Sequence, residues 1–207
     1  MINENDYDDV PQLSAESLAA LNEFYSEQRE KIEAETFNED WELSQFWYDE
    51  ETTTFLAETV IKSINGKGVV GCISCPTLYI KLLKLLKDDP TKYDFQVYLL
   101  EYDQRFASLG PNFVYYDYRT PLAVRDALPE SIFDIIVCDP PFLSEECLTK
   151  VAQTLKYLAK DKIILNTGAV LSELVDNLIG LKASSTFFPR HKNNLANQFN
   201  CFSNFSL

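Results

Sequence analysis

Helical patterns alternate with short strand-like runs from residue 52 to residue 178, and this alternation limits the fold more than any other feature. The runs typical of strands are 69–73, 97–101, 113–116, 133–138 and 162–166, and the helical patterns are 52–64, 76–87, 145–158 and 170–178. This order predicts an α/β fold in which a doubly wound, mostly parallel sheet carries helices on both faces. Two further extended segments, 183–188 and 198–205, have no helix between them and predict an antiparallel hairpin at one sheet edge, which gives seven strands.

The N-terminal part of the chain differs from the rest in charge. Residues 1–51 contain 16 acidic residues against Arg29 and Lys31, whereas residues 52–207 contain 16 of each sign, so the net charge of −14 lies entirely in the first quarter. A helix is expected over 15–35, capped by Ser14. We therefore divide the chain into an acidic N-terminal extension (1–40) and a folded domain (41–207). The acidic helix is interpreted as a solvated helix or as an acidic binding arm.

The composition excludes several classes of protein. A globally basic nucleic-acid binder is excluded because Lys and Arg must replace phosphate counterions, and the net field here repels phosphate. No apolar run has the roughly 20 residues of a membrane span, and acids stand where a signal peptide has bases. Five cysteines in an ordinary composition indicate reduced thiols. We expect a cytoplasmic protein.

The predicted topology locates a binding site before any motif is considered. In doubly wound sheets a ligand binds beyond the carboxyl ends of the strands, where the strand order reverses. The residues that follow the first four strands are 72–76, 101–103, 117–118 and 139–142. These four loops are the candidate site.

The fourth loop carries the most chemistry. It reads Asp139-Pro140-Pro141-Phe142 after an apolar strand. Two prolines make the loop stiff and leave the Pro140 carbonyl free to point into the cleft. A carboxylate and a carbonyl can accept N–H bonds from an amino group and direct its lone pair toward an electrophile, while the ring packs on the group that carries the nitrogen. The alternative is a rigid turn in which Asp139 caps a helix.

At this point the chain resembles a known family. Asp-Pro-Pro-Phe after a strand is similar to the fourth motif of class I amino-methyltransferases that use S-adenosylmethionine, a Rossmann-like fold. Five further stretches resemble the elongation factor 1-alpha lysine methyltransferases, once labelled as N6-adenine methyltransferases: LSQFWY (43–48), EYDQRF (101–106), YYDY (115–118), LSEECL (143–148) and FPRH (188–191). The resemblance covers about residues 40–207 and implies a protein-lysine N-methyltransferase whose partner is elongation factor 1-alpha.

The resemblance also implies cofactor-binding residues. It places Glu101 on the ribose hydroxyls, with Asp103 as a possible substitute, and Asp117 with Tyr118 at the adenine. The first loop departs from the general methyltransferase pattern because Gly71 is its only glycine. The remaining predicted cofactor contacts are Cys72, Ser74, Cys75 and Tyr48, with the N-terminus of the following helix facing the methionine carboxylate.

The cysteines allow two other interpretations. Cys72 and Cys75 form a Cys-x-x-Cys pair at a helix start, which is also the placement of a redox pair. A zinc site is disfavoured because no second pair has finger spacing and His191 is the single histidine. We expect no metal.

The substrate residues are expected around two aromatic and basic segments. Phe46, Trp47 and Tyr48 are either core or a wall that attracts a sulfonium and a methylated ammonium through ring faces. Pro141, Arg190 and His191 complete the predicted substrate contacts.

The expected mechanism assigns the catalytic work to the fourth loop. Lysine is protonated at neutral pH, so Asp139 is expected to orient it and to remove a proton, directly or through water, with the Pro140 carbonyl sharing the alignment and Phe142 packing beside it. Elongation factor 1-alpha is the expected partner, and the acidic extension either steers it or serves solubility. An N6-adenine nucleic-acid methyltransferase and a non-catalytic binding module remain the alternatives.

Overall fold

The computed structural model describes residues 14, 17, 40–43, 45–193 and 195–207. The chain divides into two compact units, and the larger one comprises Asn38–Ala107 and Pro111–Leu207. Outside the larger unit, the Ser17 amide donates to Ser14 Oγ (3.1 Å), as a capping serine does. The rest of the helix predicted over 15–35 lies outside the described residues, and the division at residue 40 stays a prediction.

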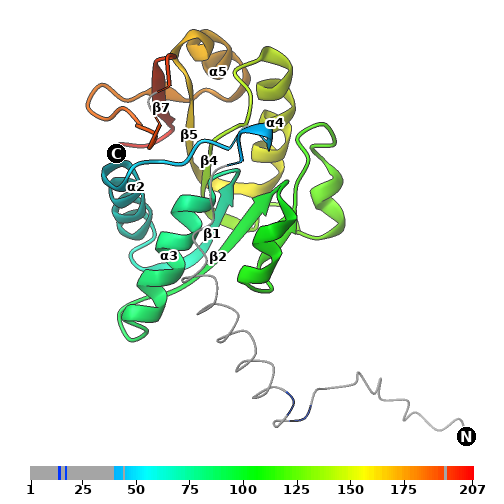
Figure 1. Ribbon diagram of the computed structural model, residues 1–207, viewed down its shortest axis with the longest axis vertical. Coiled ribbons are helices and arrows are strands. Elements are labelled where there is room, and N and C mark those ends of the chain that lie inside the picture. Colours follow the sequence, from blue (N-terminus) through cyan, green and yellow to red (C-terminus); the bar gives the residue numbers. More distant parts are fainter. Residues whose placement is uncertain (1–13, 15–16, 18–39, 44, 194) are drawn as a thin grey trace, which may run out of the picture. The chain divides into compact units, whose positions relative to one another are not determined.

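The described residues of the larger unit form seven strands and four α-helices (Figure 1). The strands are β1 (Lys67–Ile73), β2 (Asp94–Glu101), β3 (Phe113–Tyr115), β4 (Phe133–Cys138), β5 (Ala159–Gly168), β6 (Lys182–Ala183) and β7 (Phe199–Ser203). The α-helices are α2 (Glu50–Ser63), α3 (Pro76–Asp88), α4 (Glu145–Leu158) and α5 (Ser172–Ile179). Short 3-10 turns are η1 (Trp41–Leu43), η2 (Gln104–Leu109), η3 (Ala123–Asp126) and η4 (Ala169–Leu171).

The strands form one sheet in the order β3-β2-β1-β4-β5-β7-β6. The first five in chain order are parallel, whereas β7 runs antiparallel to both β5 and β6. The predicted α/β fold with a C-terminal antiparallel hairpin is confirmed. The strand order reverses between β1 and β4, whose last residues Ile73 and Cys138 are register partners. The loops after these two strands therefore lie side by side at the switch point.

The helices cover the sheet in two pairs. Helices α2 and α3 pack together, and α4 packs with α5 (Figure 1). The crossovers β1-α3-β2 and β4-α4-β5 move in opposite directions along the sheet, so right-handed connections place α3 and α4 on opposite faces. Local chemistry fixes the helix starts: Asp49 Oδ1 accepts from the Thr52 amide (2.7 Å), and Ser144 Oγ accepts from the Cys147 amide (3.2 Å).

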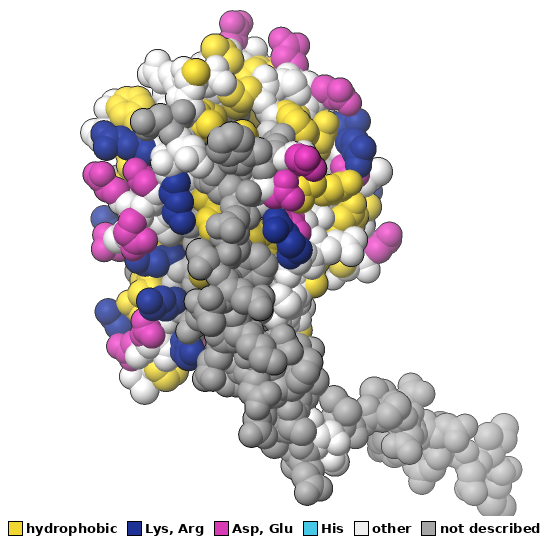
Figure 2. All heavy atoms as spheres, viewed as in Figure 1, with side chains coloured by type: hydrophobic (Ala, Val, Ile, Leu, Met, Phe, Trp, Pro, Cys, Tyr) yellow, Lys and Arg dark blue, Asp and Glu magenta, His cyan; other side chains and the backbone are white. Residues whose placement is uncertain are grey.

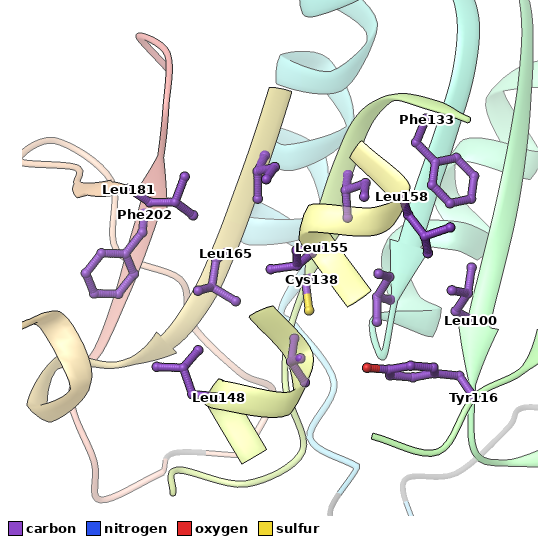
Figure 3. Packing of buried hydrophobic residues seen from close by; sticks show 14 of the residues in the cluster. Leu100, Tyr116, Phe133, Cys138, Leu148, Leu155, Leu158, Leu165, Leu181 and Phe202 are labelled. Atoms are coloured by element: carbon purple, nitrogen blue, oxygen red, sulfur yellow. The ribbon is translucent and has the colours of Figure 1, made fainter. Parts of the chain in front are cut away.

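A large hydrophobic core lies between α4 and the sheet (Figure 3). Leu148, Leu155 and Leu158 extend from α4 and are fully buried in one cluster with residues of the sheet. Burial of a leucine side chain contributes about 1.5–3 kcal/mol, so this face holds α4 and β4 in a fixed relation. The loop that joins them, 139–144, is therefore anchored at both ends.

The C-terminal part departs from the prediction in one respect. The extended segment predicted over 183–188 contributes only Lys182–Ala183 to the sheet. Ser184 Oγ accepts hydrogen bonds from the amides of Thr186 (3.2 Å) and Phe187 (3.1 Å), and this turn diverts the chain. The chain consequently leaves the sheet edge, and His191 forms an isolated antiparallel bridge with Tyr48.

The described surface carries both signs of charge. On the face drawn in Figure 2, acidic and basic side chains are interspersed rather than gathered by sign. This mixture agrees with the balance of acids and bases in residues 52–207. In the part of the chain that the structure describes, no helix combines the length and the apolar character needed to cross a bilayer.

Candidate functional site

A cavity of about 480 Å³ opens at the carboxyl ends of the parallel strands, on the switch point. This volume is within the range of small-molecule sites. It brings together thirteen of the sixteen residues predicted for the site: Phe46, Trp47, Tyr48, Ser74, Cys75, Glu101, Asp117, Tyr118, Asp139, Pro140, Pro141, Phe142 and His191. Gly71, Cys72 and Arg190 do not line it.

The segment that leads into α2 forms one wall of the cavity. We call residues 40–43 and 45–49 the crossing segment, because they run over the strand ends (Figure 1). Gln45 Nε2 donates to Asp103 Oδ2 (2.9 Å) after β2, and Asn166 Nδ2 in β5 donates to the Tyr48 hydroxyl (2.8 Å). The segment is thus fixed to both halves of the sheet.

The aromatic residues of the crossing segment combine the two roles that the sequence left open. Trp47 and Tyr48 are buried at 8% and 1% exposure, and together with Phe46 they also face the cavity. The Tyr48 backbone forms an isolated antiparallel bridge with His191, and the Lys192 amide donates to the Trp47 carbonyl (2.8 Å). These aromatic residues are therefore both core and cavity wall.

The loop after β1 makes its tight turn without glycine. Ser74 has a positive φ of 55°, a left-handed conformation that is usual for glycine and uncommon for other residues. Its amide donates to the Leu100 carbonyl (2.9 Å), so the turn is tied to β2. Cys75 then precedes α3, whose first residue is Pro76. Ser74 and Cys75 thus present the start of α3 to the cavity.

Two residues predicted in this loop belong instead to the interior of β1. A Cβ atom on Gly71 would lie 2.8 Å from the Phe133 ring, so glycine is needed here for strand packing. Cys72 is fully buried in the same strand. Neither residue lines the cavity, because these positions pack inside the sheet rather than beyond its edge, and their contact with a cofactor stays a prediction.

Glu101 ends β2 and lies on the cavity floor at 5% exposure. Its Oε1 accepts from the amides of Tyr102 (2.9 Å) and Asp103 (3.2 Å), which fixes the carboxylate plane. Burial raises the pKa of Glu101 to about 7 despite these hydrogen bonds. A carboxylate in this position can accept hydrogen bonds from two vicinal hydroxyl groups.

Asp103, the substitute considered for Glu101, is already engaged. Its carboxylate accepts from Gln45 and from Arg105 Nε (2.8 Å to Oδ2). Burial opposes ionisation of Asp103, but the hydrogen bonds from Arg105 outweigh burial and lower its pKa. Asp103 therefore anchors the crossing segment, and Glu101 is the carboxylate presented to the cavity.

Asp117 and Tyr118 lie beyond β3 on the cavity wall. Arg119 donates to both oxygens of Asp117 (3.0 Å from Nε to each, 2.7 Å from Nη2 to Oδ2), and these hydrogen bonds lower the pKa of Asp117. The Tyr118 ring meets the Phe142 ring edge-on at 5.6 Å between centroids. The loops after β3 and β4 thus form one aromatic corner.

The turn 139–142 lies next to the loop after β1, as the topology requires. The Asp139 amide donates to the Ile73 carbonyl (3.0 Å), which aligns the start of the turn with β1. One Asp139 oxygen, Oδ2, lies 3.6 Å from His191 Nε2, and both side chains are largely buried. Burial first, and the neighbouring Asp139 carboxylate second, raise the pKa of the Tyr48 phenol well above its usual value. The turn therefore presents a carboxylate inside a cavity with aromatic walls.

Arg190, also predicted to contact the substrate, points elsewhere. Its guanidinium is 3.7 Å from Glu51 Oε2, and both side chains are mostly exposed. It lines a second hollow of about 300 Å³ next to the main cavity, which shares His191, Leu195 and Phe199 with it. The two hollows share these wall residues, so Arg190 lies outside the main cavity and next to it.

Sequence reasoning missed several residues that line or support the cavity. Asn166, which supports the cavity wall, could have been found from the sequence, because it is a polar residue directly after the apolar run 163–165. Its Oδ1 is buried and lacks a hydrogen-bond partner among the described residues. Gln45 contacts Asp103, which is distant in the chain, and Arg119 pairs with the side chain of Asp117. No local sequence pattern indicates either contact.

The cysteines are all free thiols, and all five are buried. Cys75 Sγ donates to the Val137 carbonyl (3.3 Å), and burial raises the pKa of the Cys75 thiol well above its usual value. A buried thiol of this kind is unreactive. Among the described residues, no cluster of three His, Cys, Asp or Glu side chains is arranged to hold a metal ion.

Comparison with known proteins relates this geometry to a family. A family model described as Probable N6-adenine methyltransferase matches residues 39–207. The human protein named EEF1A lysine methyltransferase 1 is 45% identical over 96% of this chain and 94% of its own length. The Caenorhabditis elegans protein named Protein-lysine N-methyltransferase M142.8 is 44% identical over 97% of each chain.

A solved structure supports the fold. A Listeria monocytogenes protein described as a class I S-adenosylmethionine-dependent methyltransferase matches with a TM-score of 0.54 at 10% identity, over 90% of this chain and 70% of that chain. The seven-stranded, mostly parallel sheet with an antiparallel C-terminal strand agrees with this fold. The chain belongs to the family of EEF1A lysine methyltransferase 1, for which the matching family model carries the description Probable N6-adenine methyltransferase.

Proposed function

We propose that this protein is an S-adenosylmethionine-dependent protein-lysine N-methyltransferase that acts on the elongation factor EEF1A. The observation that carries the proposal is the single cavity that joins the Asp139–Phe142 turn to Glu101 and Ser74. One end of this cavity suits a nucleoside with a carboxylate tail, and the other suits an amino group. Relatives named as protein-lysine methyltransferases at 44–45% identity support lysine as the methyl acceptor.

The chain's own residues fit the cofactor. Glu101 would accept hydrogen bonds from the ribose hydroxyls, and Tyr118 with Phe142 would cover the adenine beside Asp117. Ser74, Cys75 and the N-terminus of α3 would receive the methionine carboxylate. When bound there, S-adenosylmethionine supplies an electrophilic methyl group.

The turn 139–142 would handle the acceptor nitrogen. The Asp139 carboxylate and the Pro140 carbonyl would accept its N–H bonds and fix the direction of its lone pair. Phe46, Trp47, Tyr48 and Pro141 would enclose the aliphatic stem, with ring faces that attract a cationic nitrogen. Arg190 is proposed to contact the substrate protein at the approach to the cavity, next to His191.

The family model's description keeps one competing function in view, methylation of the N6 amino group of adenine. An amino group is the acceptor in both cases, so the turn alone does not separate them. The names of the relatives and the net charge of −14 favour protein over nucleic acid. We also propose the cytoplasm as the compartment, since all five cysteines are free.

Transfer of a labelled methyl group tests the proposal. The purified protein is incubated with labelled S-adenosylmethionine and, separately, with EEF1A, RNA and DNA. Label on a lysine of EEF1A, located by mass spectrometry, supports the proposal, whereas label on adenine would replace it with the competing function. Calorimetry with S-adenosylhomocysteine examines the binding-module alternative, because a protein that binds no cofactor product is not a methyltransferase.

The role of the acidic extension is tested separately. A variant without residues 1–35 is compared with the full chain across a range of salt concentrations. Electrostatic steering of a basic partner predicts that the full chain loses rate with salt more steeply than the truncated chain. An equal salt dependence would exclude steering.

A further inference from the structure

His191 is the single histidine of the chain, and it is buried beside the turn 139–142. Its ring lies between Tyr48 (5.3 Å between centroids) and Phe199 (4.7 Å), and its Nε2 is 3.6 Å from Asp139 Oδ2. A separation of 3.6 Å is too long for a hydrogen bond. It is short enough that one substrate nitrogen can lie within about 3 Å of both atoms, which is the reach of proton transfer.

Methyl transfer to lysine creates a need that orientation alone does not meet. The lysine side chain is a cation at neutral pH, and its nitrogen has no lone pair until a proton leaves. A base in the cavity must therefore accept a proton once per methyl group transferred. An efficient catalytic base has a pKa near the pH at which the enzyme works.

From these contacts we infer that His191 is the proton acceptor for the substrate lysine and that Asp139 holds the resulting imidazolium. One N–H bond of the ammonium breaks, its electron pair stays on the lysine nitrogen, and the proton bonds to the Nε2 lone pair. The freed lone pair is then available to the methyl group, and the imidazolium later releases its proton to solvent. This inference rests on the proposed function and adds a role to it.

The other titratable groups that face His191 are unsuited to the task. Burial and the Asp139 carboxylate raise the pKa of Tyr48 well above its usual value, so its phenol stays protonated. Burial likewise keeps Cys75 a thiol. In short unstructured peptides an aspartate carboxylate binds a proton about 400-fold more weakly than an imidazole, so the imidazole is the stronger base of the two.

The two basic neighbours in the chain are directed away from the imidazole. The Arg190 guanidinium lies beside Glu51, and Lys192 Nζ lies over the Trp47 ring at 4.9 Å from its centroid. Neither cation is therefore placed to disfavour the positive charge of a protonated His191. The charged group beside the imidazole is the carboxylate of Asp139, whose Oδ2 lies 3.6 Å from Nε2.

Two substitutions separate a proton acceptor from a packing residue. His191→Phe keeps an aromatic ring between Tyr48 and Phe199, whereas His191→Gln keeps a polar side chain, and neither can accept the proton. For each protein, kcat/KM for EEF1A methylation is measured from pH 6 to pH 9 at saturating S-adenosylmethionine. Calorimetry with S-adenosylhomocysteine and thermal melting show that each variant is folded.

The unaltered protein should show a rate that rises with pH and then reaches a plateau. Its midpoint should agree with the titration of the single imidazole, which is followed by NMR in the ligand-free protein. Both variants should be slower by about 100-fold or more at pH 7. Their rates should then rise about tenfold per pH unit, because the lysine must lose its proton to solvent, and approach the unaltered rate near pH 9.

Three results would overturn the inference: full activity of His191→Phe at pH 7, a defect in both variants that is the same at every pH, or a rate midpoint more than one pH unit from the NMR midpoint. The first two would make His191 a packing residue. Failure of the proposed function would give a different result. The unaltered protein would then transfer no methyl group to EEF1A at any pH, whether or not it binds S-adenosylhomocysteine. That result would refute both the proposed function and the role of His191.

Discussion

Ionisation of Glu101 should control how tightly the protein binds its cofactor as the pH changes. The carboxylate form accepts hydrogen bonds from two ribose hydroxyls, whereas the protonated form must donate one of its own. Because burial raises the pKa of Glu101 to about 7, half of the ligand-free protein carries the wrong form at pH 7. Affinity should therefore fall as the pH drops through this value.

The size of the effect follows from the fraction ionised. If the ligand binds only the carboxylate form, the dissociation constant is about twofold higher at pH 7 than at its alkaline limit and about tenfold higher at pH 6. A solvent-exposed glutamate, with its ordinary pKa of 4.5, would change affinity by only a few per cent over the same range. Isothermal titration with S-adenosylhomocysteine between pH 6 and pH 8.5 measures the difference.

Glu101→Gln is the matched variant, since it keeps the shape of the side chain and removes the ionisation. It should bind more weakly at pH 8 by about 10- to 100-fold, because charged acceptors contribute about 1.5–3 kcal/mol per hydrogen bond, and its pH profile should be flat relative to the unaltered protein. His191→Gln, measured in parallel, removes any contribution of the single histidine. An unaltered protein whose affinity is equal at pH 6 and pH 8 would refute the assignment of Glu101.

The same ionisation has the opposite sign for the stability of the ligand-free protein. A carboxyl whose pKa is raised on folding binds its proton more tightly in the folded state, so its favourable contribution is present at low pH and is lost as the pH rises from 4.5 to about 7. The loss is about 3 kcal/mol for a shift of this size. The melting temperature of Glu101→Gln should therefore rise relative to that of the unaltered protein as the pH increases from 4.5 to about 7.

Three further outcomes are expected. Asp139→Asn should lower kcat by at least about 100-fold while affinity for S-adenosylhomocysteine changes little, because it removes a charge at the acceptor and not at the nucleoside; near-normal turnover would contradict the role of the turn. Gly71→Ala should cost about 1–3 kcal/mol of stability, since the added carbon meets the Phe133 ring at 2.8 Å, with unchanged affinity in the folded fraction by calorimetry. Tyr48→Phe removes the acceptor of the Asn166 amide and should lower the free energy of unfolding by about 1–3 kcal/mol, as measured by urea denaturation; no change would show that water replaces the hydroxyl.

Much of the fold could be predicted from local patterns. The alternation of strand-like and helical runs located every α-helix of the larger unit, and β4 and α4 have the predicted bounds, Phe133–Cys138 and Glu145–Leu158. Apolar residues fix such runs because the sheet is buried on both faces. The turn after Ala183 was missed, since Ser184 diverts the chain through hydrogen bonds that a residue pattern does not reveal.

Gly71 shows how a distant neighbour can explain a glycine that a local interpretation assigns to the site. A glycine close to a predicted cofactor loop invites the view that the backbone approaches a ligand there. The neighbour that requires glycine is instead Phe133, which lies 62 residues away in the sequence. Only the pairing of β1 with β4 brings the two residues together.

The order of residues along the chain was sufficient to specify the class of fold, the edge of the sheet that binds ligands and the turn Asp139–Phe142, because periodicity and stiff loops are local properties. Tertiary structure decided which carboxylate is presented and which is used for anchoring, since Asp103 is engaged by Gln45 and Arg105 while Glu101 is buried at the cavity. It also placed His191 against Asp139, across 52 residues of chain. Distances and desolvation between such remote groups arise from the packing of the whole domain.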